Sequence, residues 1–142
     1  MNHDTLARYG LRLLAGIFFA VSGTCLIAPK VLLGDMEIGL DTPTAMAEAR
    51  AGYGGAFAGL AVLFWFGAQR VNLRSVALGI AAIVLGLFTL ARAVSLTVDG
   101  VPSTLAFINH GVELVGFVLA LWLWRACPEP APSTPPGASR ST

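Results

Sequence analysis

Charged residues are scarce in this sequence: Asp, Glu, Lys and Arg make up 12% of its 142 residues, whereas 56% are hydrophobic. A soluble domain carries about a quarter charged residues, and with so few it would expose its excess apolar area as an aggregating surface. The mean hydropathy of +0.74 points the same way. We therefore expect lipid to be the solvent for most of this chain.

Basic clusters and paired cysteines are also lacking. The net charge is +1 and no run of Lys or Arg occurs, whereas a nucleic-acid partner would need such residues gathered on one face. Only two cysteines are present, Cys25 and Cys127, and the spans described below place them toward opposite sides of the membrane. We therefore expect no nucleic-acid partner, no disulfide and no Cys-x-x-Cys redox pair.

Motifs that support catalysis are missing as well. Two separated histidines and two separated cysteines do not form a tetrahedral metal site. No nucleophile elbow, Walker loop or dinucleotide fingerprint is found. We expect neither a metal nor another cofactor, and a non-enzymatic protein rather than an enzyme.

Four hydrophobic stretches are each long enough to cross about 30 Å of hydrocarbon as a helix. A helix is the form that pairs every backbone group within a single stretch in lipid. The stretches cover residues 10–28, 49–68, 75–98 and 104–124. Because short links make sequential helices antiparallel neighbours, we predict an all-α fold, with residues 1–125 forming an up-down-up-down bundle of four transmembrane helices.

Prolines, glycines and hydroxyl residues mark the ends of these stretches. Pro29 is expected to end the first helix, and residues 30–44 and 69–74 to form polar links. Hydroxyl side chains that can cap the second and fourth helices stand just before them: Thr42 or Thr44, and Ser103 or Thr104. Residues 126–142 are rich in proline, so we expect a disordered tail.

The distribution of arginines outside the spans predicts the orientation. The links on one side hold acidic residues together with Lys30, and the ends on the other side hold arginines: Arg8, Arg12, Arg70, Arg74, Arg125 and Arg140. By the positive-inside rule the arginine side faces the cytoplasm. Both chain termini, including the tail, are therefore expected there.

Five ionisable residues lie within or at the edges of the spans: Glu48, Arg50, Arg92, His110 and Glu113. A charge at mid-span costs about 2.5–3.5 kcal/mol, so such residues usually face the protein interior and find partners. Counting turns places all five in the outer half of the bundle, where Arg92 and Glu113 are the first expected pair. Tyr53 can hydrogen-bond into the same cluster.

Two interpretations of this polar cluster stay open. It can be a buried polar lock that fixes the register of apolar helices. Alternatively, it can line an outer-leaflet cavity that binds a ligand or carries a proton.

Glycines recur in the second span. Gly55 and Gly59 are four residues apart, with Gly52 preceding them, a small-xxx-small spacing that lets helix backbones approach closely. We expect these glycines to pack against another helix of the same chain in preference to a second copy.

Several of these residues together resemble a known family. They are Glu48-Ala49-Arg50-Ala51-Gly52-Tyr53-Gly54-Gly55, then Arg92, then Asp99-Gly100-Val101-Pro102, and Glu113 in the last span. In this combination the chain, over about residues 10–125, resembles the small bacterial membrane proteins grouped as domain of unknown function 4345. The resemblance implies a four-helix fold in the inner (plasma) membrane of a bacterium, and no reaction. The architecture is also similar to that of DoxX-like membrane proteins, by analogy only.

The expected function is binding of a lipid, a quinone or another amphiphile at the polar cluster, or membership of a larger membrane complex. The alternative is a proton-coupled transporter of small molecules. Glu113 would then be the titrating carboxylate and Arg92 its counter-ion. Four short helices enclose little space, so that alternative requires a homo-oligomer.

Overall fold

The structure is a computed structural model that describes residues 3–127, and all regular secondary structure in this part of the chain is helical. In chain order the elements are α1 (His3–Ile27), α2 (Pro29–Asp35), α3 (Pro43–Ala49), the π-helical segment η1 (Arg50–Ala56), α4 (Phe57–Gln69), α5 (Val71–Val98) and α6 (Thr104–Arg125). The predicted all-α class is confirmed.

Four of these helical stretches are long and apolar enough to cross a membrane. They are α1, the continuous run Pro43–Gln69, α5 and α6. Each overlaps one predicted span. Thr42 caps α3 by accepting a hydrogen bond from the amide of Ala45 at 3.1 Å, and Ser103 caps α6 through the amide of Ala106 at 3.4 Å.

Two links differ from the prediction. Pro29 follows the end of α1 as predicted, but it is also the first residue of the short helix α2. Proline fits the first turn of a helix because no backbone donor is needed there. Within α2, Leu33 is buried against Cys25, Leu40 and Ala49 in a small separate core. The expected link 69–74 shrinks to Arg70, because α5 begins at Val71.

The second long helix contains the π-helical segment η1. In a π-helix the hydrogen bonds run from residue i to residue i+5, so the turn is wider than in an α-helix. The segment holds three glycines in the series Arg50-Ala51-Gly52-Tyr53-Gly54-Gly55-Ala56. Helix faces counted at about 100° per residue therefore do not apply beyond Arg50.

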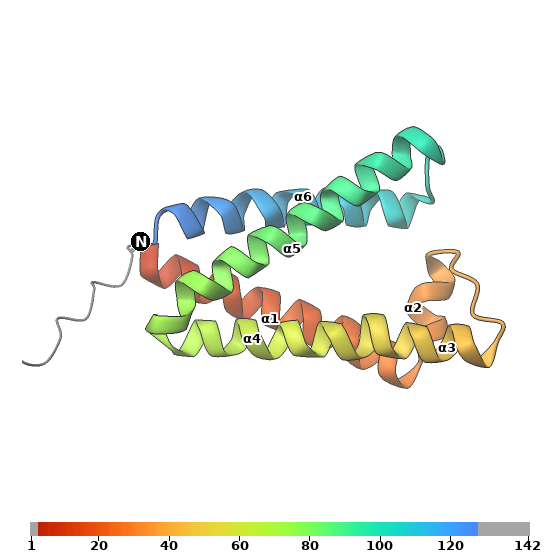
Figure 1. Cartoon of the computed structure of the whole chain (residues 1–142), viewed down its shortest axis with the longest axis horizontal. Helices are drawn as coiled ribbons and strands as arrows, with labels where there is room; N and C mark the ends of the chain where they lie inside the picture. Colours follow the sequence, from red (N-terminus) through yellow and green to blue (C-terminus); the bar gives the residue numbers. More distant parts are fainter. Residues whose placement is uncertain (1–2, 128–142) are drawn as a thin grey trace, which may run out of the picture.

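The long helices form two antiparallel hairpins, α1 with α4 and α5 with α6 (Figure 1). The hairpins meet where α4 turns into α5, around a core rich in small residues. An added Cβ at Gly67 of α4 would overlap the Cβ of Ala77 on α5, so the backbones of these two helices approach closely here. The fully buried ring of Phe64 fills the space beside them.

The first and last long helices, α1 and α6, pack together at only one end. The rings of His3 and Trp122 lie 5.5 Å apart, and an added Cβ at Gly10 would lie 3.4 Å from Leu123. From there the two hairpins diverge toward the end that holds α2, α3 and the link between α5 and α6 (Figure 1). The antiparallel bundle is therefore open along the side between α1 and α6.

Candidate functional site

A cleft of about 920 Å³ occupies this open side. Its walls come from α1 and α2 on one hairpin and from α5 and α6 on the other, with Tyr53 and Phe57 at the base. Most lining side chains are aliphatic or aromatic. Side chains that carry a polar or charged group are few: Tyr9, Tyr53, Arg92, Asn109, Glu113 and Trp122. A large apolar cavity with a few convergent polar groups is the usual form of a small-molecule site.

The polar groups of the cleft centre on one ion pair. Arg92 on α5 donates to Glu113 on α6 from Nε at 2.7 Å and from Nη2 at 3.2 Å. Asn109, one turn before Glu113, donates to the same carboxylate at 3.1 Å. The pairing expected from the sequence is thus present, in the two-bond geometry that arginine and carboxylate favour.

The two partners differ in exposure. The side chain of Glu113 is 12% exposed, and that of Arg92 is 36% exposed. The Nε and Nη2 edge of the guanidinium is used by Glu113. Nη1 makes no hydrogen bond to the residues that the structure describes. Arg92 therefore keeps an edge with two free N–H groups that can donate to another molecule.

Aromatic rings form the base of the cleft. The ring of Phe57 lies 5.0 Å from Phe18, 5.7 Å from Tyr53 and 5.9 Å from Phe88. These rings come from α1, α4, η1 and α5, and tilted or edge-to-face pairs at such distances attract one another beyond simple burial. The base is therefore a packed aromatic surface to which α1, η1, α4 and α5 contribute.

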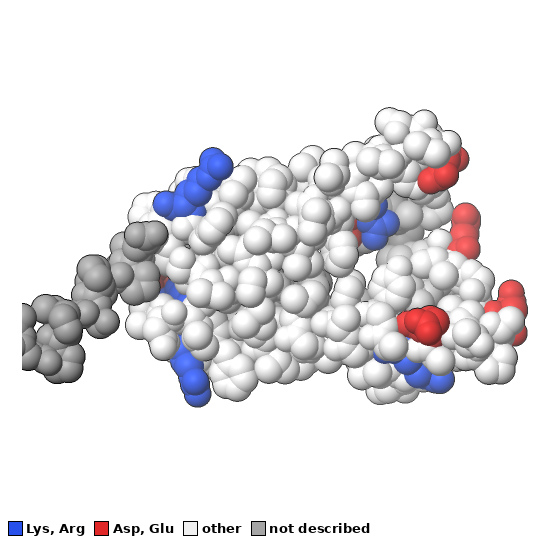
Figure 2. All heavy atoms as spheres, viewed as in Figure 1, with Lys and Arg blue, Asp and Glu red and all other residues white. Residues whose placement is uncertain are grey.

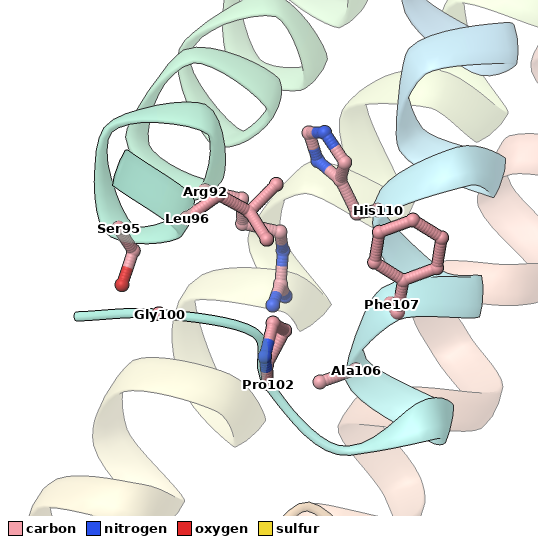
Figure 3. A pocket seen from close by; sticks show the side chains of 8 residues that line it. All are labelled: Arg92, Ser95, Leu96, Gly100, Pro102, Ala106, Phe107 and His110. Carbon is pink, nitrogen blue, oxygen red and sulfur yellow. The ribbon is translucent and has the colours of Figure 1, made fainter. Parts of the chain in front are cut away.

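A second, smaller cavity of about 70 Å³ lies between α5 and α6, near the link that joins them. Figure 3 shows Arg92 entering it from α5 and His110 and Phe107 from α6, with Gly100 and Pro102 of the link beside them. Arg92 is the one residue that lines both this cavity and the cleft. Its side chain is thus shared by the walls of the two spaces.

His110 belongs to the small cavity and not to the cleft. Its Nδ1 is buried and has no hydrogen-bond partner among residues 3–127. A buried nitrogen without a partner loses the hydrogen bond that water would supply. The sequence predicted His110 and Glu113 in one cluster, whereas His110 lines the small cavity and Glu113 lines the cleft.

Glu48 and Arg50 lie apart from the Arg92–Glu113 pair. Both are exposed, and Arg50 donates from Nε to the carbonyl of Leu26 at 3.2 Å. That carbonyl is in the last turn of α1, where no partner is left inside the helix. Counting turns along the sequence predicts only how far these residues lie from the end of their helix. It could not give the direction in which they point.

In the glycine series of the second long helix, the residue that packs closely against another helix is Gly54, in place of the predicted Gly52, Gly55 and Gly59. An added Cβ at Gly54 would lie 2.7 Å from a methyl carbon of Leu26. At Gly52 and Gly59 it would meet nothing within 4 Å, and at Gly55 only a backbone carbonyl of its own helix at 3.9 Å. The π-helical turn changes which face each glycine occupies.

Ser22 fixes the same contact between α1 and η1. Its buried hydroxyl donates to the carbonyl of Gly54 at 2.8 Å. Ser22 could not be identified from the sequence, because one serine in an apolar helix shows no spacing that marks a partner. Together the two residues hold Tyr53, the neighbour of Gly54, at the base of the cleft.

Comparison with known proteins yields one match. A family model described as Domain of unknown function (DUF4345) matches residues 6–124. This range includes every residue that lines the cleft and the small cavity. No curated protein and no solved structure matches the chain.

Proposed function

The chain belongs to the family described as domain of unknown function 4345, and we propose that this member binds an amphiphile in the cleft between its two helix hairpins. The amphiphile is a lipid, a quinone or a similar molecule with an apolar body and a polar head. One observation carries the proposal: a cleft of about 920 Å³, apolar over most of its wall, has the Arg92–Glu113 pair as its polar centre.

The shape and chemistry of the cleft suit such a ligand. Its volume falls within the range of about 300–1,000 Å³ typical of small-molecule sites. Aliphatic side chains of α1 and α6, such as Ile17 and Val112, and the aromatic base would contact the apolar body. The free edge of Arg92 would donate hydrogen bonds to the polar head of the ligand. Tyr53 lines the same cleft.

The open side of the bundle suggests the route of entry. Because α1 and α6 meet at one end only, the cleft opens between them toward the hydrocarbon in which these helices would lie. An amphiphile dissolved in the bilayer could enter sideways without crossing the aqueous phase. This route suits a molecule whose apolar part stays in lipid throughout.

We place the protein in the inner membrane of a bacterium with both termini in the cytoplasm. Acidic side chains gather at the end that holds α2 and α3, where some basic side chains also lie, whereas the side chains that stand out at the end with the start of α1 are basic (Figure 2). The arginine-rich end is the cytoplasmic one under the positive-inside rule. The Arg92–Glu113 pair then lies in the outer half of the membrane.

Native mass spectrometry of protein extracted gently from its own membrane tests the proposal. Wild type is compared with Ala91→Trp, which fills the cleft from α5, and with Val94→Trp on the same helix. Val94 is 53% exposed and lines neither space. We expect a small molecule bound to wild type and to Val94→Trp and lost from Ala91→Trp. Correctly assembled wild type without any bound molecule would overturn the proposal and favour a structural role for the ion pair.

A further inference from the structure

We infer that the head group accepted by this site is a small carboxylate, held in the cavity between α5 and α6, so that the ligand is a single-chain acid of the fatty-acid class. This inference rests on the proposed function, because it assigns the head group of the same amphiphile. It follows from the size of the small cavity, the charges in its wall and the position of Arg92.

The size of the cavity limits the head group. About 70 Å³ has room for a few water molecules or one small polar group. The head group of a phospholipid, with its phosphate, glycerol and alcohol, is far larger. A carboxylate fits.

The wall of the cavity offers donors and no acidic side chain. The two ionisable residues in its lining are Arg92 and His110. Glu113 binds the opposite edge of Arg92 and lines the cleft, not the cavity. Ser95 also lines the cavity, but its hydroxyl hydrogen is used by Asp99 at 2.6 Å. The free Nη1 edge of Arg92 and the unpaired ring nitrogen of His110 are thus the donors for a carboxylate.

A carboxylate adds a single negative charge to the site. Arg92 and Glu113 neutralise each other, so a bound anion adds one negative charge beside them. Nδ1 of His110, which has no hydrogen-bond partner among residues 3–127, can face this charge as a ring N–H donor. A phosphomonoester would add nearly two negative charges at neutral pH, with the same two donor groups to meet them.

The position of Arg92 suits a ligand whose head group lies in the cavity and whose alkyl chain lies in the cleft. Because Arg92 lines both spaces, a ligand whose carboxylate contacts Nη1 in the cavity has its alkyl chain directed past the guanidinium into the cleft. One chain can pass beside a single side chain. Two acyl chains on a glycerol backbone would have to displace the Arg92–Glu113 pair.

Binding of palmitate and of methyl palmitate to purified full-length protein in detergent tests the inference, measured by displacement of a fluorescent fatty acid. The ester keeps the chain and removes the charge. We expect wild type to bind palmitate about tenfold more tightly than the ester, the change that one charge-assisted hydrogen bond would give. Ala106→Phe, which fills the cavity, should remove this preference and keep ester binding.

Val118→Phe is the matched control, since Val118 is on α6, is 54% exposed and lines neither space. If Ala106→Phe does not fold, Ala106→Leu replaces it. Equal affinity for acid and ester in wild type would overturn the inference and leave amphiphile binding intact. Retention of the preference in a folded Ala106 variant would also overturn it. Binding of neither probe would overturn it too, and the native mass spectrum then decides the proposed function separately.

Discussion

Arg74 on α5 pairs with Asp4 on α1 and donates to the carbonyl of Ala68 at 3.3 Å, so that one guanidinium joins α1, α4 and α5. Its side chain is 5% exposed, whereas that of Asp4 is 53% exposed. The arginine is therefore the buried partner of the pair. It lies at the end of the molecule where the two hairpins meet.

Replacing Arg74 by methionine should lower the free energy of unfolding by about 1.5–3 kcal/mol, the usual contribution of hydrogen bonds to a charged group. Asp4 can stay hydrated after the change, so no buried charge is left behind. Thermal unfolding in detergent measures the effect. Arg70→Met is the control, because Arg70 is exposed and contacts the ring of Phe66 only at the surface; an equal loss of stability in both variants would contradict the role given to Arg74.

Gly54→Ala should destabilise the protein by about 1–3 kcal/mol, because the new methyl group overpacks a tight contact with Leu26. Gly59→Ala, with no atom within 4 Å of the added carbon, should be neutral or stabilise by up to about 1 kcal/mol, since alanine favours a helix more than glycine does. Chemical denaturation of both variants compares them. The opposite ranking would mean that Gly59 packs against another chain and that Leu26 readily moves aside.

The four long helices could be predicted from the sequence because their length and apolarity follow directly from the thickness of a bilayer. The caps at Thr42 and Ser103 could also be predicted, because a hydroxyl side chain just before an apolar run can accept a hydrogen bond from a backbone amide in the first turn of the helix. The helix α2 was not predicted. Its start at Pro29 looks like a stop signal unless the burial of Leu33 is known.

The candidate site was predictable only in part. Arg92 and Glu113 could be paired from the sequence, because a short link joins their two antiparallel helices and the two residues lie at similar distances from that link. The cleft, in contrast, depends on the angle between the hairpins, which no local pattern encodes. Arg50 shows the same limit, because its partner is a backbone carbonyl and backbone partners leave no signature in the sequence.

The proposed orientation, with both termini in the cytoplasm, predicts which residues a reagent added outside the cell can reach. We expect Asp41→Cys to react in intact cells with a thiol reagent that does not cross membranes, and Arg70→Cys to react only after the membrane is opened. Both positions are exposed and lie at opposite ends of the helix run Pro43–Gln69. The native cysteines are first replaced by alanine. If Arg70→Cys were labelled in intact cells and Asp41→Cys were not, the orientation would be the opposite of the proposed one.

Removing one partner of the Arg92–Glu113 pair should be far more costly than removing both. Arg92→Leu leaves the 12% exposed carboxylate of Glu113 without its counter-ion, which typically costs about 3–5 kcal/mol. The double variant Arg92→Leu/Glu113→Leu leaves no unpaired charge, and replacing a whole buried pair by apolar residues is often neutral. Unfolding free energies of the wild type, the two single variants and the double variant form the complete cycle.

This cycle also separates the two interpretations of the polar cluster. If the pair serves the ligand, the double variant should fold with nearly wild-type stability and emerge from its membrane without the bound molecule, because the donor edge of Arg92 is gone. If the pair is a lock, the double variant should instead lose its unique packing, with a broadened unfolding transition, while any ligand held by apolar contacts alone is retained. A stable double variant that still carries the wild-type ligand would refute the assignment of Arg92 as the group that contacts the head.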